Sequence, residues 1–349
     1  MAKISCVMAN YNTDSVMLSQ SIISILNQTY KDFEFIIVDD ASTDSSFNVL
    51  LEFAQKDSRI KLYRNEINSG LAYSMNRAID YSNGEYIARM DTDDIAIEDR
   101  FAIQVAFLDM NQNIDICGSF ARNFGANNNF NLTPYYKSDY CAIQLLFATC
   151  LVHPTVMIRK EFLKKNNLTY NENFRCSQDF DLWTKAVEYG KIEMINKVLL
   201  FYRIHSNQIS TSKRGLQRKY AVEICTRQIQ KLINPITEEE LKLHLVICGF
   251  EPINESNIGL VAAWIKKLLT LNLQKKLYNP PVMEEVLNNR IFNLILKSDM
   301  SKKKKLSILV KYGLINASNI NTILYRLGFR IRYNRYYNNL LSKINVINR

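Results

Sequence analysis

The stretch FEFIIVDDASTD, which runs from Phe33 to Asp44, decides the fold of this chain. Its first half, Phe33–Val38, is a short apolar run typical of a strand. Asp44–Gln55 then carries apolar residues at the three- and four-residue spacing of a helix. A strand this apolar is buried on both faces of its sheet. The stretch therefore predicts a buried strand, a polar turn and a covering helix.

The same alternation continues on both sides of this stretch. Further apolar runs predict strands at Ile4–Met8, Ile60–Tyr63 and Tyr86–Met90, and segments of helical period lie between them at Ser15–Asn27 and Leu71–Tyr81. This order predicts an α/β fold, in which a mostly parallel sheet has helices on both faces. Ligands bind such sheets beyond the carboxyl ends of the strands.

Three predicted strands end in polar residues, at Ala9–Asn12, Asp39–Asp44 and Asp91–Asp94. We expect these ends to converge on one crevice lined by carboxylates and amides, although Ser42–Asp44 equally suits a helix N-cap. The carboxylates of Asp91–Asp94 would repel one another without a bound cation or a donor-rich ligand. Oxygen ligands in an Asp-x-Asp arrangement suit Mg²⁺ or Mn²⁺ rather than zinc.

The net charge of +10 on the 349 residues is unevenly distributed. Residues 1–210 carry 20 Lys and Arg against 25 Asp and Glu, a net −5, whereas residues 211–349 carry 24 against 9, a net +15. A basic C-terminal part fits nucleic acid, an anionic membrane surface or a well-solvated helical bundle, and charge alone does not choose among these.

Cysteine usage and hydropathy bear on the compartment. The seven cysteines form no C-x-x-C pair and several lie in apolar runs, which predicts reduced, buried thiols and a cytoplasmic protein. We expect neither a membrane span nor a secretory signal peptide, because no apolar stretch approaches roughly 18 residues and the N-terminus leads directly into a strand-like run.

Six motifs in order resemble glycosyltransferase family 2. They are MANYN (Met8–Asn12), SIISILNQTY (Ser21–Tyr30), VDDASTD (Val38–Asp44), NSGL (Asn68–Leu71) with Asn76, GEYI (Gly84–Ile87) and DTDD (Asp91–Asp94). The resemblance covers residues 1 to about 210 and implies a GT-A fold, with a Rossmann-like nucleotide-sugar-binding half and an acceptor-binding half. It suggests a catalytic domain at residues 1–214 and a basic helical domain at residues 215–349.

The same resemblance implies roles for the polar strand ends. Asp39 and Asp40 would contact the base and ribose, and Asp91, Asp93 and Asp94 would hold the ribose and a Mn²⁺ or Mg²⁺ ion on the diphosphate, with Asp93 the principal metal ligand. The full set of expected donor-binding residues is Ala9, Tyr11, Asp39, Asp40, Asn68, Gly70, Asn76, Asp91, Thr92 and Asp93.

Another stretch, CSQDFDLW (Cys176–Trp183), resembles the Glu-Asp-x-Asp-Leu element of the family. Its first Asp, here Asp179, would be the catalytic base, although a carboxylate favoured at a helix start is the alternative. Asp181 is expected to be such a helix-start residue. Gln178 replaces the more common Glu, which weakens an acceptor contact, and Trp183 is a further candidate for the acceptor side.

Two histidines complete the expected site. YRIHSNQIS (Tyr202–Ser210) resembles the element that closes the catalytic domain: His205 would complete the metal shell or bind the leaving diphosphate, and Arg203 would orient carboxylates or contact phosphate. His153, in LVHPTVM, would contact the acceptor or a phosphate. A histidine near a strand end is otherwise a satisfied structural residue.

The resemblance implies inverting transfer of a sugar from a nucleotide donor, expected to be UDP-linked, to a hydroxyl of a glycan or a polyprenyl-diphosphate-linked acceptor. An ion would stabilise the leaving diphosphate, and a carboxylate with a pKa of about 3.9 would accept the acceptor's proton. The richness in Asn, Ile and Lys indicates an AT-rich bacterial genome, and hence capsule, exopolysaccharide or other cell-envelope glycan synthesis.

The last third has helical period throughout, which predicts mostly core-facing stripes. The expected helices are Leu216–Leu232, Thr237–Cys248, Ile258–Leu271, Met283–Leu296 and Leu306–Tyr312, followed by a basic aromatic run at Tyr325–Tyr337. Lys302–Lys305 and that run suit an anionic membrane surface, which would place the protein peripherally on the inner face of the cytoplasmic membrane; a solvated face is the alternative.

Three other functions fit parts of the pattern. A dinucleotide-dependent oxidoreductase would need G-x-G-x-x-G after the first strand, where Ala9–Asn12 stands instead. A nucleic-acid-binding protein would explain the basic tail, but the acidic crevice would repel a phosphate backbone, so no nucleic acid is expected. A sugar nucleotidyltransferase is closer, yet no glycine-rich phosphate loop lies near the N-terminus.

Overall fold

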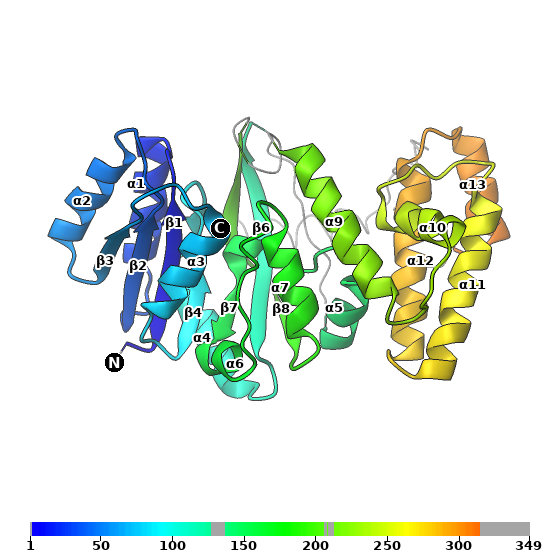
Figure 1. Cartoon of the computed structure of the whole chain (residues 1–349), viewed down its shortest axis with the longest axis horizontal. Coiled ribbons are helices and arrows are strands. Elements are labelled where there is room, and N and C mark those ends of the chain that lie inside the picture. Colours follow the sequence, from blue (N-terminus) through cyan, green and yellow to red (C-terminus); the bar gives the residue numbers. More distant parts are fainter. Residues whose placement is uncertain (1, 127–136, 206–207, 209–212, 315–349) are drawn as a thin grey trace, which may run out of the picture.

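A single eight-stranded sheet forms the centre of the N-terminal two thirds (Figure 1). The computed structural model describes residues 2–126, 137–205, 208 and 213–314. The strand order is β3-β2-β1-β4-β7-β6-β8-β5. The strands are β1 (Ile4–Asn10), β2 (Phe33–Asp39), β3 (Ile60–Arg64), β4 (Tyr86–Arg89), β5 (Ile95–Ala96), β6 (Ile116–Gly125), β7 (Met157–Arg159) and β8 (Ile192–Ile204).

The sheet is mostly parallel, as predicted. Strands β3, β2, β1 and β4 are parallel neighbours, with Ile4 opposite both Phe33 and Tyr86. Beyond them β7 is antiparallel to β4 and to β6, β8 is parallel to β6, and β5 is antiparallel to β8. The four predicted strands therefore form the parallel half, and the remaining strands extend it into a mixed sheet.

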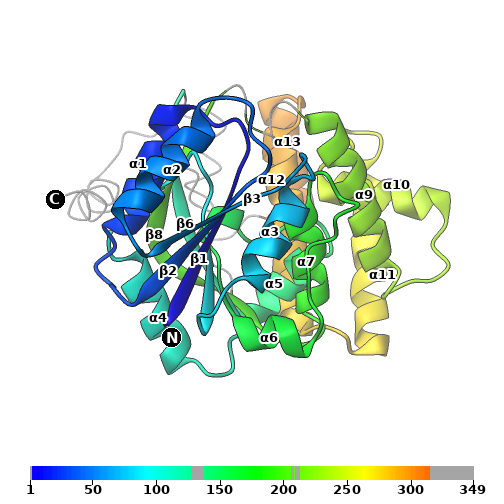
Figure 2. The same ribbon diagram turned by 60° about the vertical axis from the view of Figure 1, so that its left-hand side comes forward.

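Helices cover both faces of the sheet (Figure 2). They are α1 (Ser15–Leu26), α2 (Ser46–Lys56), α3 (Leu71–Asp80) and α4 (Arg100–Met110). Because side chains alternate along a strand, Cys6 and Met8 of β1 join a core with α1, α2 and α4, whereas Val7 joins a second core with α3. This double burial explains why the strand runs are so uniformly apolar.

The middle of the chain adds the elements that close the site. These are α5 (Ser138–Gln144), a 3₁₀ turn η1 (His153–Thr155), α6 (Lys160–Lys165) and α7 (Gln178–Ala186). All seven cysteines of the chain are free and buried, in agreement with the sequence-based expectation.

The C-terminal part is helical, and it lies at one end of the molecule (Figure 1). Its helices are α9 (Arg214–Ile229), α10 (Glu238–Cys248), α11 (Ile258–Lys275), α12 (Pro280–Lys297) and α13 (Lys302–Lys311), so each predicted helix is present. Thr237 forms a capping box with Glu240 at the start of α10. One buried cluster runs from Val7 in the sheet to Leu309 in α13.

Two expectations for the basic tail have different outcomes. Ile308 and Leu309 of α13 are buried in the protein core, so this helix does not present an apolar stripe for insertion into a bilayer. The Tyr325–Tyr337 run lies outside the described residues. Within the described ranges, none of the helices combines the length and the apolar character that crossing a bilayer requires.

Candidate active site

A cleft of about 1000 Å³ opens where β1, β4 and β8 end, beside α7 and η1. Of the residues predicted for the site, those that line this cleft are Ala9, Tyr11, Asp40, Asn68, Gly70, Asp91, Thr92, Asp93, His153, Gln178, Asp179 and His205. The predicted residues that lie behind its wall are Asp39, Asn76, Asp94, Trp183 and Arg203. The polar strand ends therefore converge, as their positions in the sequence indicated.

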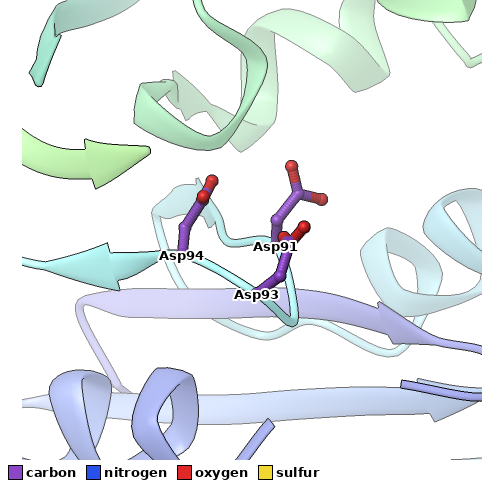
Figure 3. Close-up of side chains that lie close together, drawn as sticks. All are labelled: Asp91, Asp93 and Asp94. Atoms are coloured by element: carbon purple, nitrogen blue, oxygen red, sulfur yellow. The ribbon is translucent and has the colours of Figure 1, made fainter. Parts of the chain in front are cut away.

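The loop after β4 carries three carboxylates whose side chains point to the same side (Figure 3). One carboxylate oxygen from each of Asp91, Asp93 and Asp94 lies within 4.8 Å of the others. The hydroxyl of Ser21 donates to the carbonyl of Asp91 at 2.6 Å, which fixes the loop to α1. The position of the cluster is therefore set by the end of the strand and by a neighbouring helix.

Burial and mutual repulsion act together on this cluster. Burial, and then the neighbouring carboxylates of Asp91 and Asp93, raise the pKa of Asp94 well above its usual range. Burial also raises the pKa of Asp91, against the opposing effect of the Arg89 guanidinium with which it forms an ion pair. Such carboxylates are stabilised in their ionised form by a bound cation.

The end of β8 reaches this cluster. Nε2 of His205 lies 2.8 Å from Oδ2 of Asp93, and the backbone N–H of Arg203 donates to Oδ1 of Asp94 at 2.8 Å. Oδ2 of Asp94 is buried without a partner among the described residues. Three carboxylates and one imidazole, with an unfilled buried oxygen, fit Mn²⁺ or Mg²⁺. The side chain of Arg203 instead donates to Asp93's carbonyl oxygen at 2.6 Å and supports the loop.

The two carboxylates after β2 are held by internal hydrogen bonds. Asp39 is buried and accepts hydrogen bonds from the Asn10 amide at 2.8 Å and from the Ser42 hydroxyl at 2.5 Å. Asp40 accepts from the backbone N–H groups of Ser69 at 2.9 Å and Gly70 at 2.8 Å. The Asp40 carboxylate thus fixes the loop that begins α3 and also lines the cleft.

Gly70 is required by its surroundings. Its φ of 95° lies in the left-handed region, and a Cβ there would come within 2.6 Å of Nη1 of Arg175. That guanidinium donates to the carbonyl of Ser69 at 3.0 Å. Two loops far apart in the sequence therefore meet at this edge of the cleft.

Asp179 lies in the first turn of α7 and lines the cleft. Burial raises its pKa, against the opposing effects of the Phe180 backbone N–H and of Arg89. Ser177, just before the helix, has a φ of 58°, an uncommon value for a residue with a side chain. Beside Asp179, Oε1 of Gln178 is buried without a partner among the described residues.

Asp181 has a different environment. Its carboxylate is fully buried and pairs with Lys185 at 2.7 Å and with Arg227 of α9 at 2.5 Å. It therefore links α7 to the C-terminal helices, which agrees with the structural role expected from the sequence.

His153 lines the cleft and contacts Tyr170 and Trp183. Its Nε2 lies 2.7 Å from the Tyr170 hydroxyl, and burial lowers its pKa well below the usual range, so the ring is neutral. The side chain of Asn76 exchanges two hydrogen bonds of 2.9 Å with the main chain of Tyr170. Trp183 packs edge-on against His153 at 6.0 Å. Asn76 and Trp183 do not line the cleft, and they support Tyr170 and His153 through these contacts.

The cleft also contains residues that the sequence analysis did not single out. Arg89, Arg175 and Lys213 are cationic residues in its wall. The only available signal for Arg89 was a charged residue inside an otherwise apolar strand run.

This fold and this acidic cleft define a nucleotide-sugar-dependent transferase, and the comparisons with known proteins agree. The family model described as Glycosyl transferase family 2 matches residues 5–179. The chain belongs to this family, whose members are inverting enzymes. Membership in this family favours a glycosyltransferase over the oxidoreductase, the nucleic-acid-binding protein and the sugar nucleotidyltransferase considered from the sequence.

Three similar proteins illustrate the range of the match. An uncharacterized glycosyltransferase of Methanocaldococcus jannaschii is 36% identical over 225 residues, which are 62% of this chain and 76% of the relative. The UDP-Glc:alpha-D-GlcNAc-diphosphoundecaprenol beta-1,3-glucosyltransferase WfgD of Escherichia coli is 30% identical over 223 residues, 63% of this chain and 84% of the relative. The crystal structure of S. aureus TarS in complex with UDP-GlcNAc superposes with a TM-score of 0.58 at 17% identity, covering 95% and 94% of the two chains.

Proposed function

We propose that this protein transfers a sugar from a UDP-sugar to a hydroxyl of a lipid-diphosphate-linked glycan during the synthesis of a cell-envelope polysaccharide. The observation that carries the proposal is the cluster of Asp91, Asp93 and Asp94, of which Asp91 and Asp93 line the same cleft as Asp179. The names of the Escherichia coli relative and of the TarS complex support a UDP-linked donor, and the former supports an acceptor on a diphosphate lipid.

The donor side of the cleft holds the nucleotide and a divalent ion. Asp91, Asp93, Asp94 and His205 would hold Mn²⁺ or Mg²⁺, which when bound neutralises charge on the leaving diphosphate. The nucleotide lies along the ends of β1 and β2, in contact with Ala9, Tyr11, Asp40, Asn68, Gly70 and Thr92. Asp39 acts from behind by fixing Asn10 and Ser42.

Asp179 is the general base. It accepts the proton of the acceptor hydroxyl, whose oxygen attacks the anomeric carbon as the bond to the diphosphate breaks. One such displacement inverts the anomeric centre. Burial suits this role because it makes the carboxylate a stronger base than an exposed Asp. His153, neutral and hydrogen-bonded to Tyr170, and Gln178 contact the acceptor sugar.

The two parts of the chain have different roles. Residues 1–214 are the catalytic domain. Residues 215–349, which are helical over the described part 215–314, approach the anionic inner face of the cytoplasmic membrane through their positive charge. Lys302, Lys303 and Lys304 are exposed on α13 and supply part of this charge. Because the apolar side of α13 is buried, the attraction from this helix is electrostatic.

A panel of nucleotide sugars tests the function. With Mn²⁺ present, one UDP-sugar should raise the melting temperature more than the others, and a synthetic sugar-diphosphate lipid should become glycosylated with inverted anomeric configuration, measured by NMR. Failure of every nucleotide sugar to bind, or incorporation of a nucleoside triphosphate into a nucleotide sugar, would overturn the proposal.

A further inference from the structure

Arg89, the last residue of β4, places a guanidinium in the wall of the cleft. Its side chain is only 3% exposed and forms an ion pair with Asp91 through Nη2. Nε and Nη1 are buried and have no hydrogen-bond partner among the described residues. Buried N–H groups of this kind are normally satisfied, so two unpartnered donors on a residue that lines the cleft indicate a place for ligand oxygens.

A second buried arginine gives the comparison. The Arg100 guanidinium donates from Nε to Oε1 of Gln104 at 2.9 Å and from Nη2 to the carbonyl of Arg89 at 2.8 Å. Its Nη1 lies 3.5 Å from Sδ of Met90. The hydrogen-bond donors of the structural Arg100 guanidinium thus have partners. Two donors of Arg89, which lines the cleft, have none among the described residues.

The surroundings of Arg89 select the class of ligand. Asp91 and Asp179 both interact electrostatically with this guanidinium, and the unpartnered Oε1 of Gln178 belongs to the same cleft. The Asp179 carboxylate and the Gln178 amide oxygen, which are not among the groups that would hold the ion, disfavour a phosphate group at this position. A neutral sugar suits it, because each hydroxyl can accept from the guanidinium and donate to a carboxylate.

We infer that Arg89 binds hydroxyl oxygens of the sugar that is being transferred, between the acidic cluster and Asp179. This inference rests on the proposed function, because the donor sugar must lie between its leaving diphosphate and the base. Arg89 contacts the substrate in this role, and its pair with Asp91 couples the position of the sugar to the acidic loop.

The test separates binding of the sugar from binding of the nucleotide. Titrations with Mn²⁺ would measure the Kd values of UDP, UDP-glucose and UDP-N-acetylglucosamine for wild type, R89K and R89Q. Lys keeps the charge near Asp91 and loses the planar pair of donors. Whichever UDP-sugar wild type binds more tightly should lose at least tenfold in affinity in both variants, whereas UDP should change by less than twofold in R89K, which keeps a positive charge beside Asp91.

R100K is the matched control. It should lower the melting temperature while leaving the affinities for UDP and for the UDP-sugar unchanged. Equal losses of UDP and UDP-sugar in R89K, or unchanged UDP-sugar binding, would overturn the inference while leaving the proposed function standing. Absence of UDP-sugar binding by wild type would overturn both.

A measurement on wild type does not depend on the folding of the variants. In protein labelled with ¹⁵N at arginine, one Nε–H signal should change on addition of the UDP-sugar and not on addition of UDP. R175K, at the other arginine of the cleft wall, should retain that signal. Loss of the signal in R175K, or no sugar-specific change in wild type, would overturn the inference.

Discussion

Nε2 of His205 lies 2.8 Å from Oδ2 of Asp93, although 112 positions separate the two residues in the chain. The strands explain the contact. β5 begins directly after the acidic loop and pairs antiparallel with β8, so that Ile95 lies opposite Phe201. The end of β8 therefore returns to the loop from which β5 starts. The pairing of a two-residue strand thus completes the candidate metal site.

Metal-dependent donor binding should depend on this contact. With Mn²⁺, UDP should stabilise the protein by about 2.7 kcal/mol over the ligand-free state when free UDP is 100-fold above its Kd, and the same UDP concentration with EDTA should stabilise it less. Asp93→Ala should abolish that difference, and His205→Gln should reduce it, in thermal unfolding experiments. Asp80→Ala, at an exposed carboxylate at the end of α3, should behave as wild type. Full metal-dependent stabilisation of Asp93→Ala would remove the metal assignment.

The assignment of the base predicts a selective loss of rate. Asp179→Asn keeps the size of the side chain but accepts no proton, so transfer should fall by about 10²–10⁴-fold. The affinity for UDP should change little, as measured by calorimetry. Near-normal transfer, or equal losses of transfer and UDP affinity, would show that the base is elsewhere.

Asp181→Asn is the built-in control for that variant. Because Asp181 is buried between Lys185 and Arg227, this substitution should lower the free energy of unfolding by about 1–3 kcal/mol. Transfer per folded molecule should remain near that of wild type. A loss of rate as large as that of Asp179→Asn would contradict the separation of the two roles.

The pH dependence of transfer should carry the signature of a partly buried base. Asp179 must be ionised to accept a proton, and burial raises its pKa. The rate should therefore rise with pH through an apparent pKa above the ordinary value of about 3.9. Rate measurements with donor saturating would locate this acid limb. A limb at or below the ordinary value would contradict the effect of burial.

The sequence predicted the parallel half of the sheet because each strand and helix there has a clear period. It predicted the polar strand ends for the same reason, since the residues after a parallel strand must lie at one edge of the sheet. The strands β5 and β7 have two and three residues, too few for a periodic pattern. Their antiparallel pairing, and with it the contact between Asp93 and His205, was therefore inaccessible from local pattern.

The sequence also did not predict which side chains of the site point into the cleft. Asn76 and Trp183 have residue types that suit ligand binding, yet they face Tyr170 and His153 from behind the wall of the cleft. Arg89 was overlooked because it lies in an apolar strand run, where a charge is recognised as functional only once its open donors are seen. Residue type and position predicted the region of the site but not which atoms face the cleft.

The proposed association with the membrane should depend on the lysines of α13. Lys302→Ala combined with Lys303→Ala should weaken binding to acidic vesicles by about 2 kcal/mol, roughly 30-fold, at low salt. Co-sedimentation would measure it. Lys266→Ala combined with Lys276→Ala instead removes two exposed charges, one from α11 and one from the residue that follows it, and serves as the control. Equal losses in the two double variants would indicate nonspecific charge, and equal binding of wild type to neutral vesicles would contradict the proposal.

Without a bound ion, the charge of the acidic cluster should lower the free energy of unfolding near neutral pH. Asp94 has a folded-state pKa raised above its unfolded value, so its contribution to stability is fully present below about pH 3.9 and is lost as pH rises through the folded pKa. Asp94→Asn keeps an acceptor for the backbone N–H of Arg203 and removes the buried charge.

In EDTA at neutral pH the Asp94→Asn variant should gain about 1 kcal/mol in free energy of unfolding, and the gain should shrink toward acidic pH. In Mn²⁺ with UDP the order should reverse, because the variant has lost a carboxylate of the cluster. Urea unfolding across pH, with and without the ion, would measure both effects, and a variant that is less stable than wild type in EDTA at every pH would contradict the prediction.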